Sequence, residues 1–452
     1  MIVLARVLGP DDFGLYALCL VFLNVLTYVS IFGLDSAVIH KQKDSDEVFG
    51  TATFLRFLFS VVLAATLLIL APVIADIVGN DKLIDPLRVS GIAIILAALG
   101  FDTSVRLAKD LRFKSVSAVK AVNIVAWSVT AFVLAYLGFG FWSLLFGFVA
   151  GVTGSVIVLW LIQPWRIGRW MNTAIARELL RFGAFSMGSG LLAMLVWNVD
   201  KLAVSAVLGS SALVGVYYIA FTYGTIIPNL FTGVVGTVMF PTFSRMQKDV
   251  PGLRSTYLRA LKYMSYASIP AGVGLAVISK PLVLEVLGSE WSEAVTPLII
   301  FSSFGVLNSL VSPAGSVFLA TGNPHKMFRQ SWTMAVIFFV LLIPAVFYWK
   351  LAGVALLFLV TGVGSTVWIF LMVADILDFK ILEELKMLEA PIVASALMAA
   401  ISLGIGILMG VTSLSLAVQV SVAIPTYLVW MFLLTRGEIV KDIKYLLASA
   451  RR

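Results

Sequence analysis

The sequence predicts an all-α polytopic membrane protein. We expect two six-helix pseudo-repeat lobes around a central cavity and a further pair of C-terminal helices, with the first helix truncated. Apolar residues fill 60% of the 452 positions and charged residues only 12%, against about 25% charged residues in an ordinary soluble domain. Long apolar stretches without charge recur along the whole chain. The loops between them alternate between many and few basic residues, as the loops of multi-pass membrane proteins do.

Dividing the apolar stretches at about 20 residues per crossing predicts thirteen complete helices. The third is the least regular, because its uncharged run between Arg88 and Asp102 is short, but deleting it would reverse the side of every later loop. The expected cores are Phe13–Leu34, Val48–Ile74, Leu87–Val105, Ala118–Leu137, Trp142–Ile162, Phe182–Leu208, Leu213–Phe240, Leu258–Val286, Ala294–Ala320, Met327–Tyr348, Val354–Ile376, Met387–Met409 and Leu414–Leu434.

A helix fragment, Met1–Leu8, precedes these thirteen and runs directly into the turn Gly9-Pro10. An internal repeat indicates what it is, because the pattern from Val7 to Tyr16 recurs from Val207 to Tyr217 at an offset of 200 to 201. The second copy has a full helix before its Leu-Gly turn. We therefore expect roughly 20–30 further residues upstream, the alternative being a genuine short form.

The repeat predicts the domain organisation. Residues 1–162 form an N-terminal lobe with an incomplete first helix, 163–378 a C-terminal lobe, 379–435 an extra helix pair and 436–452 an amphipathic cytoplasmic tail. Six crossings return a chain to its starting side, so the two lobes have the same orientation. A pseudo-twofold axis along the membrane normal relates such lobes, an arrangement that favours transport between two rocking halves.

The loop charges predict the orientation. Sparse loops hold only Arg6, Lys82, Arg88, Lys280 and Lys350, and two basic residues, Arg56 and Lys201, lie inside expected helices. All other Lys and Arg residues fall in the alternate loops and the C-terminal tail, which the positive-inside rule places in the cytoplasm. The net charge of +8 follows this topology rather than one continuous basic face, so we expect no nucleic acid partner.

Several motifs together resemble a known family. They are Leu4-Ala5-Arg6-Val7-Leu8-Gly9-Pro10-Asp11-Asp12-Phe13-Gly14, Gly33-Leu34, Leu111-Arg112-Phe113-Lys114, Gly138-Phe139-Gly140 and Asp200-Lys201 before Leu208-Gly209. This pattern resembles the Wzx-type (colanic acid and O-unit) polysaccharide flippases of the multidrug/oligosaccharidyl-lipid/polysaccharide exporter superfamily. The resemblance implies fourteen helices in the bacterial inner membrane. It also implies translocation of undecaprenyl-pyrophosphate-linked oligosaccharide repeat units for exopolysaccharide, O-antigen or capsule, with polysaccharide polymerase or export machinery as a partner.

Such a substrate carries a pyrophosphate dianion and sugars, so its path must be cationic and hydrated. Arg56 is the leading candidate for pairing with the phosphate oxygens, because charges inside membrane helices are costly. The alternative is that its head snorkels to the cytoplasmic interface. Asp200 and Lys201 come next. Adjacent helical positions do not face each other, so we expect these two side chains to point apart.

The remaining candidates have a structural interpretation beside the functional one. Asp102 and Arg106 are four residues apart in the favourable order and are expected to pair with each other. Asn24 and Asn198 would bind sugar hydroxyls, or hydrogen-bond between packed helices. No cofactor or metal is expected, because His40 and His325 lack partners at metal-ligand spacing. Proton or sodium coupling would involve Asp102 or Asp200.

Two other functions stay open. The closer one is a multidrug cation antiporter of the same superfamily, although such proteins favour acidic cavities and this chain has an intrahelical arginine. The other is a membrane glycosyltransferase or ligase, for which Asp44-Ser45-Asp46 has the required DxD form but stands in a short loop without a nucleotide-binding domain. No phosphate-binding glycine loop occurs, which argues against direct ATP drive.

Overall fold

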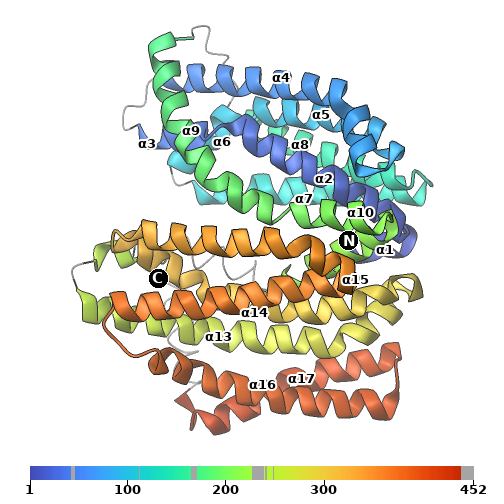
Figure 1. Ribbon diagram of the computed structural model, residues 1–452, viewed down its shortest axis with the longest axis vertical. Coiled ribbons are helices and arrows are strands. Elements are labelled where there is room, and N and C mark those ends of the chain that lie inside the picture. Colours follow the sequence, from blue (N-terminus) through green and yellow to red (C-terminus); the bar gives the residue numbers. More distant parts are fainter. Residues whose placement is uncertain are drawn as a thin grey trace. The chain divides into compact units, whose positions relative to one another are not determined.

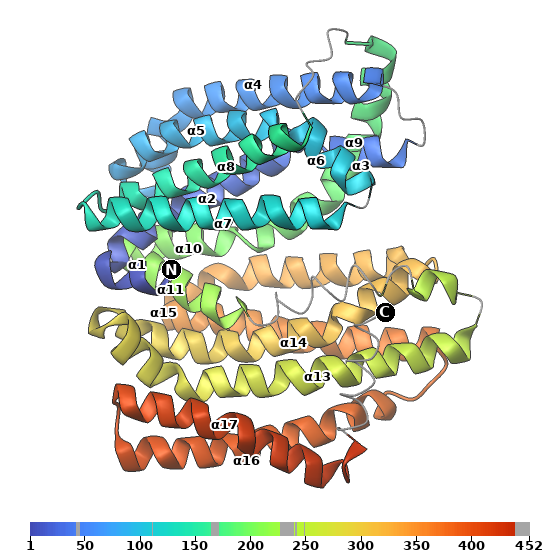
Figure 2. The same ribbon diagram turned by 180° about the vertical axis from the view of Figure 1, so that it is seen from behind.

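The computed structural model describes residues 1–41, 46–110, 112–163, 171–226, 239, 242–247 and 249–438. These residues are mostly helical and contain no strand, which confirms the predicted all-α class. The chain divides into two compact units, Met1–Tyr218 (unit 1) and Ile219–Arg452 (unit 2). Figures 1 and 2 show their helices from opposite sides. The predicted lobes were defined by the sequence repeat and do not coincide with these units. The lobes and the central cavity stay predictions.

Unit 1 holds most of the first half of the chain. Its elements are α1 (Ile2–Val7), α2 (Pro10–Ile31), α3 (Leu34–His40), α4 (Asp46–Val78), η1 (Asp81–Leu83), α5 (Ile84–Leu99), α6 (Phe101–Lys109), α7 (Phe113–Tyr136), α8 (Phe141–Ile162), α9 (Thr173–Val196), α10 (Val199–Leu208) and the start of α11 (Ser211–Gly224). The apolar core around α3, α4, α6 and α9 includes Leu34, Phe49 and Leu179.

Unit 2 holds the remaining helices. They are α13 (Val250–Pro281), η2 (Leu282–Leu287), η3 (Ser289–Ala294), α14 (Val295–Ala320), α15 (Pro324–Ile376), α16 (Leu382–Met409) and α17 (Ser413–Leu434). The final pair α16 and α17 packs against α13. Of the predicted tail 436–452, only the first residues are described, and the part after residue 438 lies outside the described residues.

Helix boundaries follow the turn signals. Gly9 precedes α2 and Pro10 takes its first position, where a missing N–H costs nothing, while Asp11 and Asp12 complement the helix dipole. Gly209 ends α10 with a left-handed φ of 62°. Lys350, with φ of 50°, interrupts α15 and separates the predicted helices Met327–Tyr348 and Val354–Ile376.

Two predicted helices contain a local break in the helical backbone. Leu87–Val105 bends by 47° between α5 and α6, at Gly100, where the missing side chain makes room for Leu159. Phe182–Leu208 is interrupted between α9 and α10, where Asn198 has φ of −129°. Helical periodicity in sequence does not register such breaks, because the residues on both sides stay apolar.

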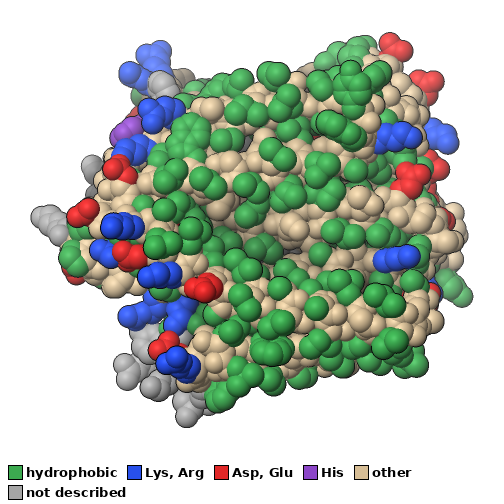
Figure 3. Space-filling model, turned by 60° about the horizontal axis from the view of Figure 1, so that its bottom comes forward, with side chains coloured by type: hydrophobic (Ala, Val, Ile, Leu, Met, Phe, Trp, Pro, Cys, Tyr) green, Lys and Arg blue, Asp and Glu red, His purple; other side chains and the backbone are tan. Residues whose placement is uncertain are grey.

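The membrane-spanning character is clear within the described residues. Ten helices are long and apolar enough to cross a bilayer, or eleven if the bent pair α5 and α6 counts as one span. In Figure 3, charged side chains gather near the ends of the helices and the surface between them is largely hydrophobic. A surface of this kind suits lipid as its solvent. The chain is a multi-pass membrane protein, although this count does not test the predicted thirteen helices.

Small residues set the closest helix packing in unit 1. Gly147 and Gly151 on α8 face α7, and a side chain at Gly147 would come within 2.8 Å of the Ala131 Cβ atom. At Gly151 an added Cβ atom would lie 3.0 Å from the Asn123 carbonyl oxygen. The GxxxG spacing therefore has the packing role that close helix approach in membranes requires.

Candidate functional site

Arg56 lies inside unit 1, about 15 Å along α4 from its first residue, Asp46. Its side chain is buried, with the residue only 3% exposed. The Nη1 atom donates to the Thr27 carbonyl oxygen at 3.2 Å and to the Ser30 hydroxyl oxygen. Both acceptors belong to the last turn of α2, where the helix dipole favours a cation. The snorkelling interpretation requires an exposed head and does not describe this side chain.

The Arg56 charge is poorly compensated. Among the described residues it forms no salt bridge, and Asp35 is the carboxylate close enough to act on it electrostatically. Its Nε atom is buried and has no hydrogen-bond partner. A buried cation with spare donors is unfavourable unless an anion completes its shell. The geometry therefore leaves donor capacity for an anionic ligand, which the planar guanidinium can bind through two nitrogens.

The two asparagines lie together where α2 passes the break between α9 and α10. The Asn24 Nδ2 atom donates to the Asn198 Oδ1 atom at 3.3 Å, and the Asn198 Nδ2 atom donates to the Met194 carbonyl oxygen at 2.8 Å. The interhelical hydrogen bond expected from sequence is thus present. Asn24 is nevertheless exposed, in the middle of α2 and between apolar neighbours. An exposed amide at that position can hydrogen-bond to water that reaches the helix.

Asp200 and Lys201 form a buried ion pair, which corrects the expectation that they point apart. The Lys201 Nζ atom donates to both Asp200 carboxylate oxygens, at 2.9 and 3.2 Å, and to the Trp197 carbonyl oxygen at 2.9 Å. The Tyr217 hydroxyl donates to Asp200 Oδ2 at 2.6 Å. Since both residues lie in the first turn after the break, the long lysine side chain can fold back, and simple helical spacing does not apply. This cluster ties α10 to α11.

Asp102 and Arg106 also pair, as their spacing predicted. The Arg106 Nε atom lies 2.9 Å from Asp102 Oδ1, and an Nη2 atom lies 3.1 Å from Asp46 Oδ1. The guanidinium stacks over the Phe49 ring, 3.8 Å from its centroid. These contacts join the first turn of α4 to α6. Asp46 belongs to the DxD segment, and its carboxylate is already paired with Arg106. Asp44 and Ser45 lie outside the described residues.

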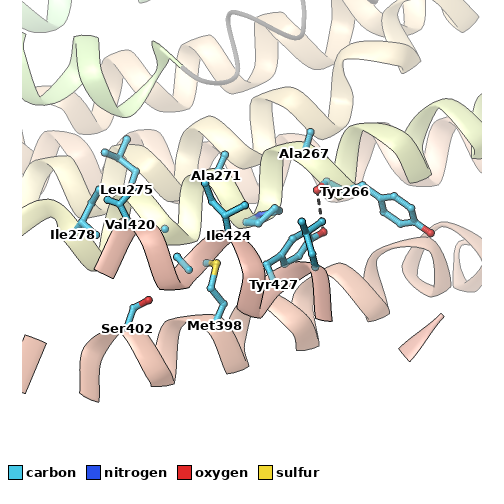
Figure 4. Close-up of a pocket in the computed structure, with 14 residues that line it drawn as sticks. Tyr266, Ala267, Ala271, Leu275, Ile278, Met398, Ser402, Val420, Ile424 and Tyr427 are labelled. Atoms are coloured by element: carbon cyan, nitrogen blue, oxygen red, sulfur yellow. Dashed lines mark hydrogen bonds between the residues drawn. The ribbon is translucent and has the colours of Figure 1, made fainter. Parts of the chain in front are cut away.

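Unit 2 contains an apolar pocket of about 410 Å³ between α13, α16 and α17. Figure 4 shows Leu275 and Ile278 of α13, Met398 of α16 and Ile424 of α17 among the side chains that line it. Its polar groups are few, and the Tyr427 hydroxyl already donates to the Tyr266 carbonyl oxygen at 2.9 Å. The pocket suits a hydrocarbon ligand. No pattern in the sequence marked it, because the parts of the three helices that line the pocket are almost uniformly apolar.

Sequence reasoning also missed a polar junction at the start of α16. The Arg254 Nη2 atom lies 2.6 Å from both carboxylate oxygens of Glu383, and the Tyr257 hydroxyl donates to Glu384 at 2.6 Å. Glu384 is fully buried, and its second oxygen has no partner. The three-residue spacing of Arg254 and Tyr257 on α13 was the available signal. No group of three or more His, Cys, Asp or Glu side chains that would suit a metal occurs in the part of the chain that the structure describes.

The profile of the family described as "Polysaccharide biosynthesis protein" matches residues 3–296, well over half of the chain. The chain belongs to this family. Among curated relatives, "Lipopolysaccharide biosynthesis protein WzxC" of Escherichia coli (strain K12) is 24% identical over 416 residues, covering 90% of this chain and 84% of its own. "Probable low-salt glycan biosynthesis flippase Agl15" of Haloferax volcanii is 22% identical over 422 residues, covering 91% and 86%. The resemblance drawn from the motifs is confirmed.

Solved structures agree on the fold of this family member. "Lipid II flippase MurJ, inward closed conformation" superposes with a TM-score of 0.77 at 17% identity, covering 96% of this chain and 98% of that one. An inward-facing multidrug resistance MATE family transporter gives 0.65 at 16% identity, covering 83% and 94%. At such identities the likeness concerns the fold alone, which this chain shares with those membrane transporters.

Proposed function

We propose that this protein is a flippase that moves undecaprenyl-pyrophosphate-linked oligosaccharide repeat units across the bacterial inner membrane. The almost full-length similarity to proteins named for polysaccharide and glycan biosynthesis supports the substrate class. The observation that points to a binding site is the buried side chain of Arg56, whose Nε atom has no hydrogen-bond partner. The products served would be exopolysaccharide, O-antigen or capsule.

Side chains within each unit, taken separately, suit parts of this substrate. In unit 1, Arg56 would bind a pyrophosphate oxygen through its unpaired donor while Thr27 and Ser30 hold its Nη1 atom. The exposed Asn24 and its partner Asn198 would meet sugar hydroxyls. In unit 2, the apolar pocket would accommodate part of the lipid tail, whose transfer from lipid to an apolar lining costs little. Movement would be by alternating access.

Proton or sodium coupling belongs to the same proposal, with Asp102 and Asp200 as the residues to test. Each already has a basic partner, at 2.9 Å in both cases. A coupling ion would therefore have to compete with an existing ion pair. We would test Asp200 first, because its pair is the more deeply buried of the two. A polysaccharide polymerase or export complex is the partner we propose for receiving the flipped unit.

The decisive experiment is deletion of the gene, extraction of lipid-linked oligosaccharides and quantification of surface polysaccharide, with complementation by the encoded chain. A flippase predicts accumulation of completed lipid-linked repeats and loss of surface polymer. Unchanged repeats and polymer would overturn the proposal in favour of a cation extruder, the second function that the fold permits. Incomplete repeats would instead indicate a role in assembly of the substrate.

A further inference from the structure

The two halves of α15 meet in a short hairpin turn at Lys350. Its backbone has φ of 50° and ψ of −134°, a conformation that glycine adopts easily and a residue with a side chain adopts rarely. Gly140, the residue before α8, has φ of 52° and ψ of −135°. The hairpin of α7 and α8 therefore makes the same reversal with the residue that suits it. The α15 hairpin has a lysine in that conformation, at a cost in stability.

Close packing of the two halves of α15 maintains the strained turn. A side chain at Gly353 would overlap the Ala345 carbonyl oxygen, and its Cβ atom would lie 2.9 Å from the Trp349 Cβ atom. The backbones thus touch close to the reversal, and a relaxed turn would push them apart. Glycine at position 350 would relieve the strain without changing the turn. Backbone strain that packing holds in place is typical of functional positions, so it indicates a use for the Lys350 side chain.

The lysine lies beside three exposed aromatic side chains. Phe347, Tyr348 and Trp349 directly precede it and are 70%, 72% and 65% exposed. The centroids of the Phe347 and Tyr348 rings lie 5.3 Å apart, and those of the Tyr348 and Trp349 rings 6.3 Å apart. Lys350 is itself exposed and forms no salt bridge or hydrogen bond with the described residues. Aromatic rings and a lysine at a helix end are typical of the membrane–water interface.

The position of the turn in the chain places it at the outer interface. The halves of α15 match two predicted spans, so the chain leaves the hydrocarbon before Lys350 and re-enters it afterwards. This loop is one of those with few basic residues, which the charge rule assigns to the outer side. A phospholipid offers acyl chains to the rings and a phosphate to the ammonium group. A zwitterionic headgroup also carries a cation, so an anionic headgroup complements the lysine better.

We propose that Lys350 and the exposed rings of Phe347, Tyr348 and Trp349 bind an anionic phospholipid of the outer leaflet. The lipid holds the tip of the α15 hairpin at the interface, and its attraction to the ammonium group offsets the strain of the turn. The hairpin of α7 and α8 also has an exposed aromatic residue, Tyr136, but no basic residue at its turn. It should bind lipids without a preference for charge. This inference does not depend on the transported substrate.

Fluorescence quenching by brominated lipids tests the site. Cys19 is the single cysteine, so a Cys19→Ser chain with Leu356→Cys carries one bimane label, at an exposed position shortly after the turn. In reconstituted membranes, brominated phosphatidylglycerol should bind beside this label about fivefold better than brominated phosphatidylcholine, the preference that one interfacial cation gives. Lys350→Gln should reduce the ratio to about one, and Lys350→Arg should preserve it.

The matched reporter is Phe146→Cys on α8, which follows Gly140 at the same distance in sequence and is also exposed. Its label should show no preference between the two lipids. Equal binding of both lipids beside Leu356→Cys would overturn the site, as would an unchanged preference in the Lys350→Gln protein or the same preference beside Phe146→Cys. Absence of quenching by either lipid would show that protein covers the tip, which would also overturn it.

Lys350→Gly separates the strain from the charge. In detergent without lipid, this variant should melt about 2 °C higher than the natural chain, even after allowance for the greater freedom of glycine in the unfolded state. Lys350→Gln keeps the strain and should melt at the temperature of the natural chain. Both variants should lose the preference for phosphatidylglycerol. A lower melting temperature for Lys350→Gly would show that the turn is not strained, and would remove the reason to assign the lysine a ligand.

Discussion

At the scale of single residues, the charges inside unit 1 differ in how they are satisfied. Lys201 pairs with Asp200, and Arg106 pairs with Asp102 and Asp46. Arg56 has no such partner among the described residues and relies on the polar end of α2. The sequence singled out both Arg56 and Lys201 as basic residues within apolar stretches, with Arg56 first. The structure distinguishes the two residues by their partners. The charge of Lys201 is neutralised by Asp200 and stabilises the fold, whereas the charge of Arg56 is available to an anionic ligand.

Replacing Arg56 with methionine tests its role. Arg56→Met keeps the bulk of the side chain and removes a buried cation, so the protein should remain at least as heat-stable in detergent as the natural chain. Export of lipid-linked repeats should fall at least tenfold at matched abundance in the membrane. Arg88→Ala, at an exposed pair with Asp85, is the control and should change neither quantity. Normal export by the methionine variant would remove Arg56 from the mechanism.

The Asp200–Lys201 pair predicts non-additive effects on stability. Asp200→Asn alone leaves a buried ammonium group without its carboxylate, so unfolding should become easier by about 3–5 kcal/mol. Adding Lys201→Met should recover most of that loss, because no unpaired charge then remains. Thermal unfolding of the single and double variants measures this cycle. Equal destabilisation by the single and double variants would show that the two charges do not stabilise each other.

At the scale of elements, glycine decides where helices approach, bend and cross. Gly147 and Gly151 allow α8 to pack closely on α7, Gly100 lies at the bend between α5 and α6, and Gly14 meets Gly215. The sequence made only the first of these clear, since GxxxG has a recognisable spacing. The other two depend on a partner that is distant in the sequence, and no local pattern specifies it.

One added methyl group should force α2 and α11 apart where they cross. Gly215→Ala places a Cβ atom on the Pro10 carbonyl oxygen, so the helices must move apart. Asp11→Cys with Ser211→Cys, in a Cys19→Ser chain, places two thiols where side-chain oxygens now lie 2.7 Å apart. In that background, Gly215→Ala should lower the yield of the disulfide severalfold. Gly188→Ala is a suitable comparison, because nothing lies within 4 Å of the added atom on α9. Equal yields in the two alanine variants would mean that α2 and α11 do not touch at this point.

At the scale of the whole molecule, the order of spans and their charged ends define an orientation. Helix ends that carry pairs such as Arg254 with Glu383 and Lys326 with Asp375 lie at the ends predicted to face the cytoplasm. The connection from α16 to α17 around Gly410 has no basic residue and should face outward. The C-terminus then returns to the cytoplasm, which we propose for this chain.

Reporter fusions test that orientation. Alkaline phosphatase joined after Gly410 should be active, because it folds outside the inner membrane, whereas fusions after Lys380 or Arg436 should be inactive. Green fluorescent protein at the same positions should give the reverse pattern. An active phosphatase after Lys380 would invert the assigned topology and place the Gly14–Gly215 crossing on the inner side.

The sequence by itself determined the class of molecule, the positions of most spans and the family. It could do so because hydropathy, loop charge and short motifs are local properties of consecutive residues, and the bilayer acts on them directly. Only the tertiary structure decided that Lys201 folds back onto Asp200, that Arg56 binds the end of α2 and that Tyr257 holds Glu384. These pairings depend on which helices become neighbours and how each is broken. Long-range packing fixes both, and no local pattern encodes it.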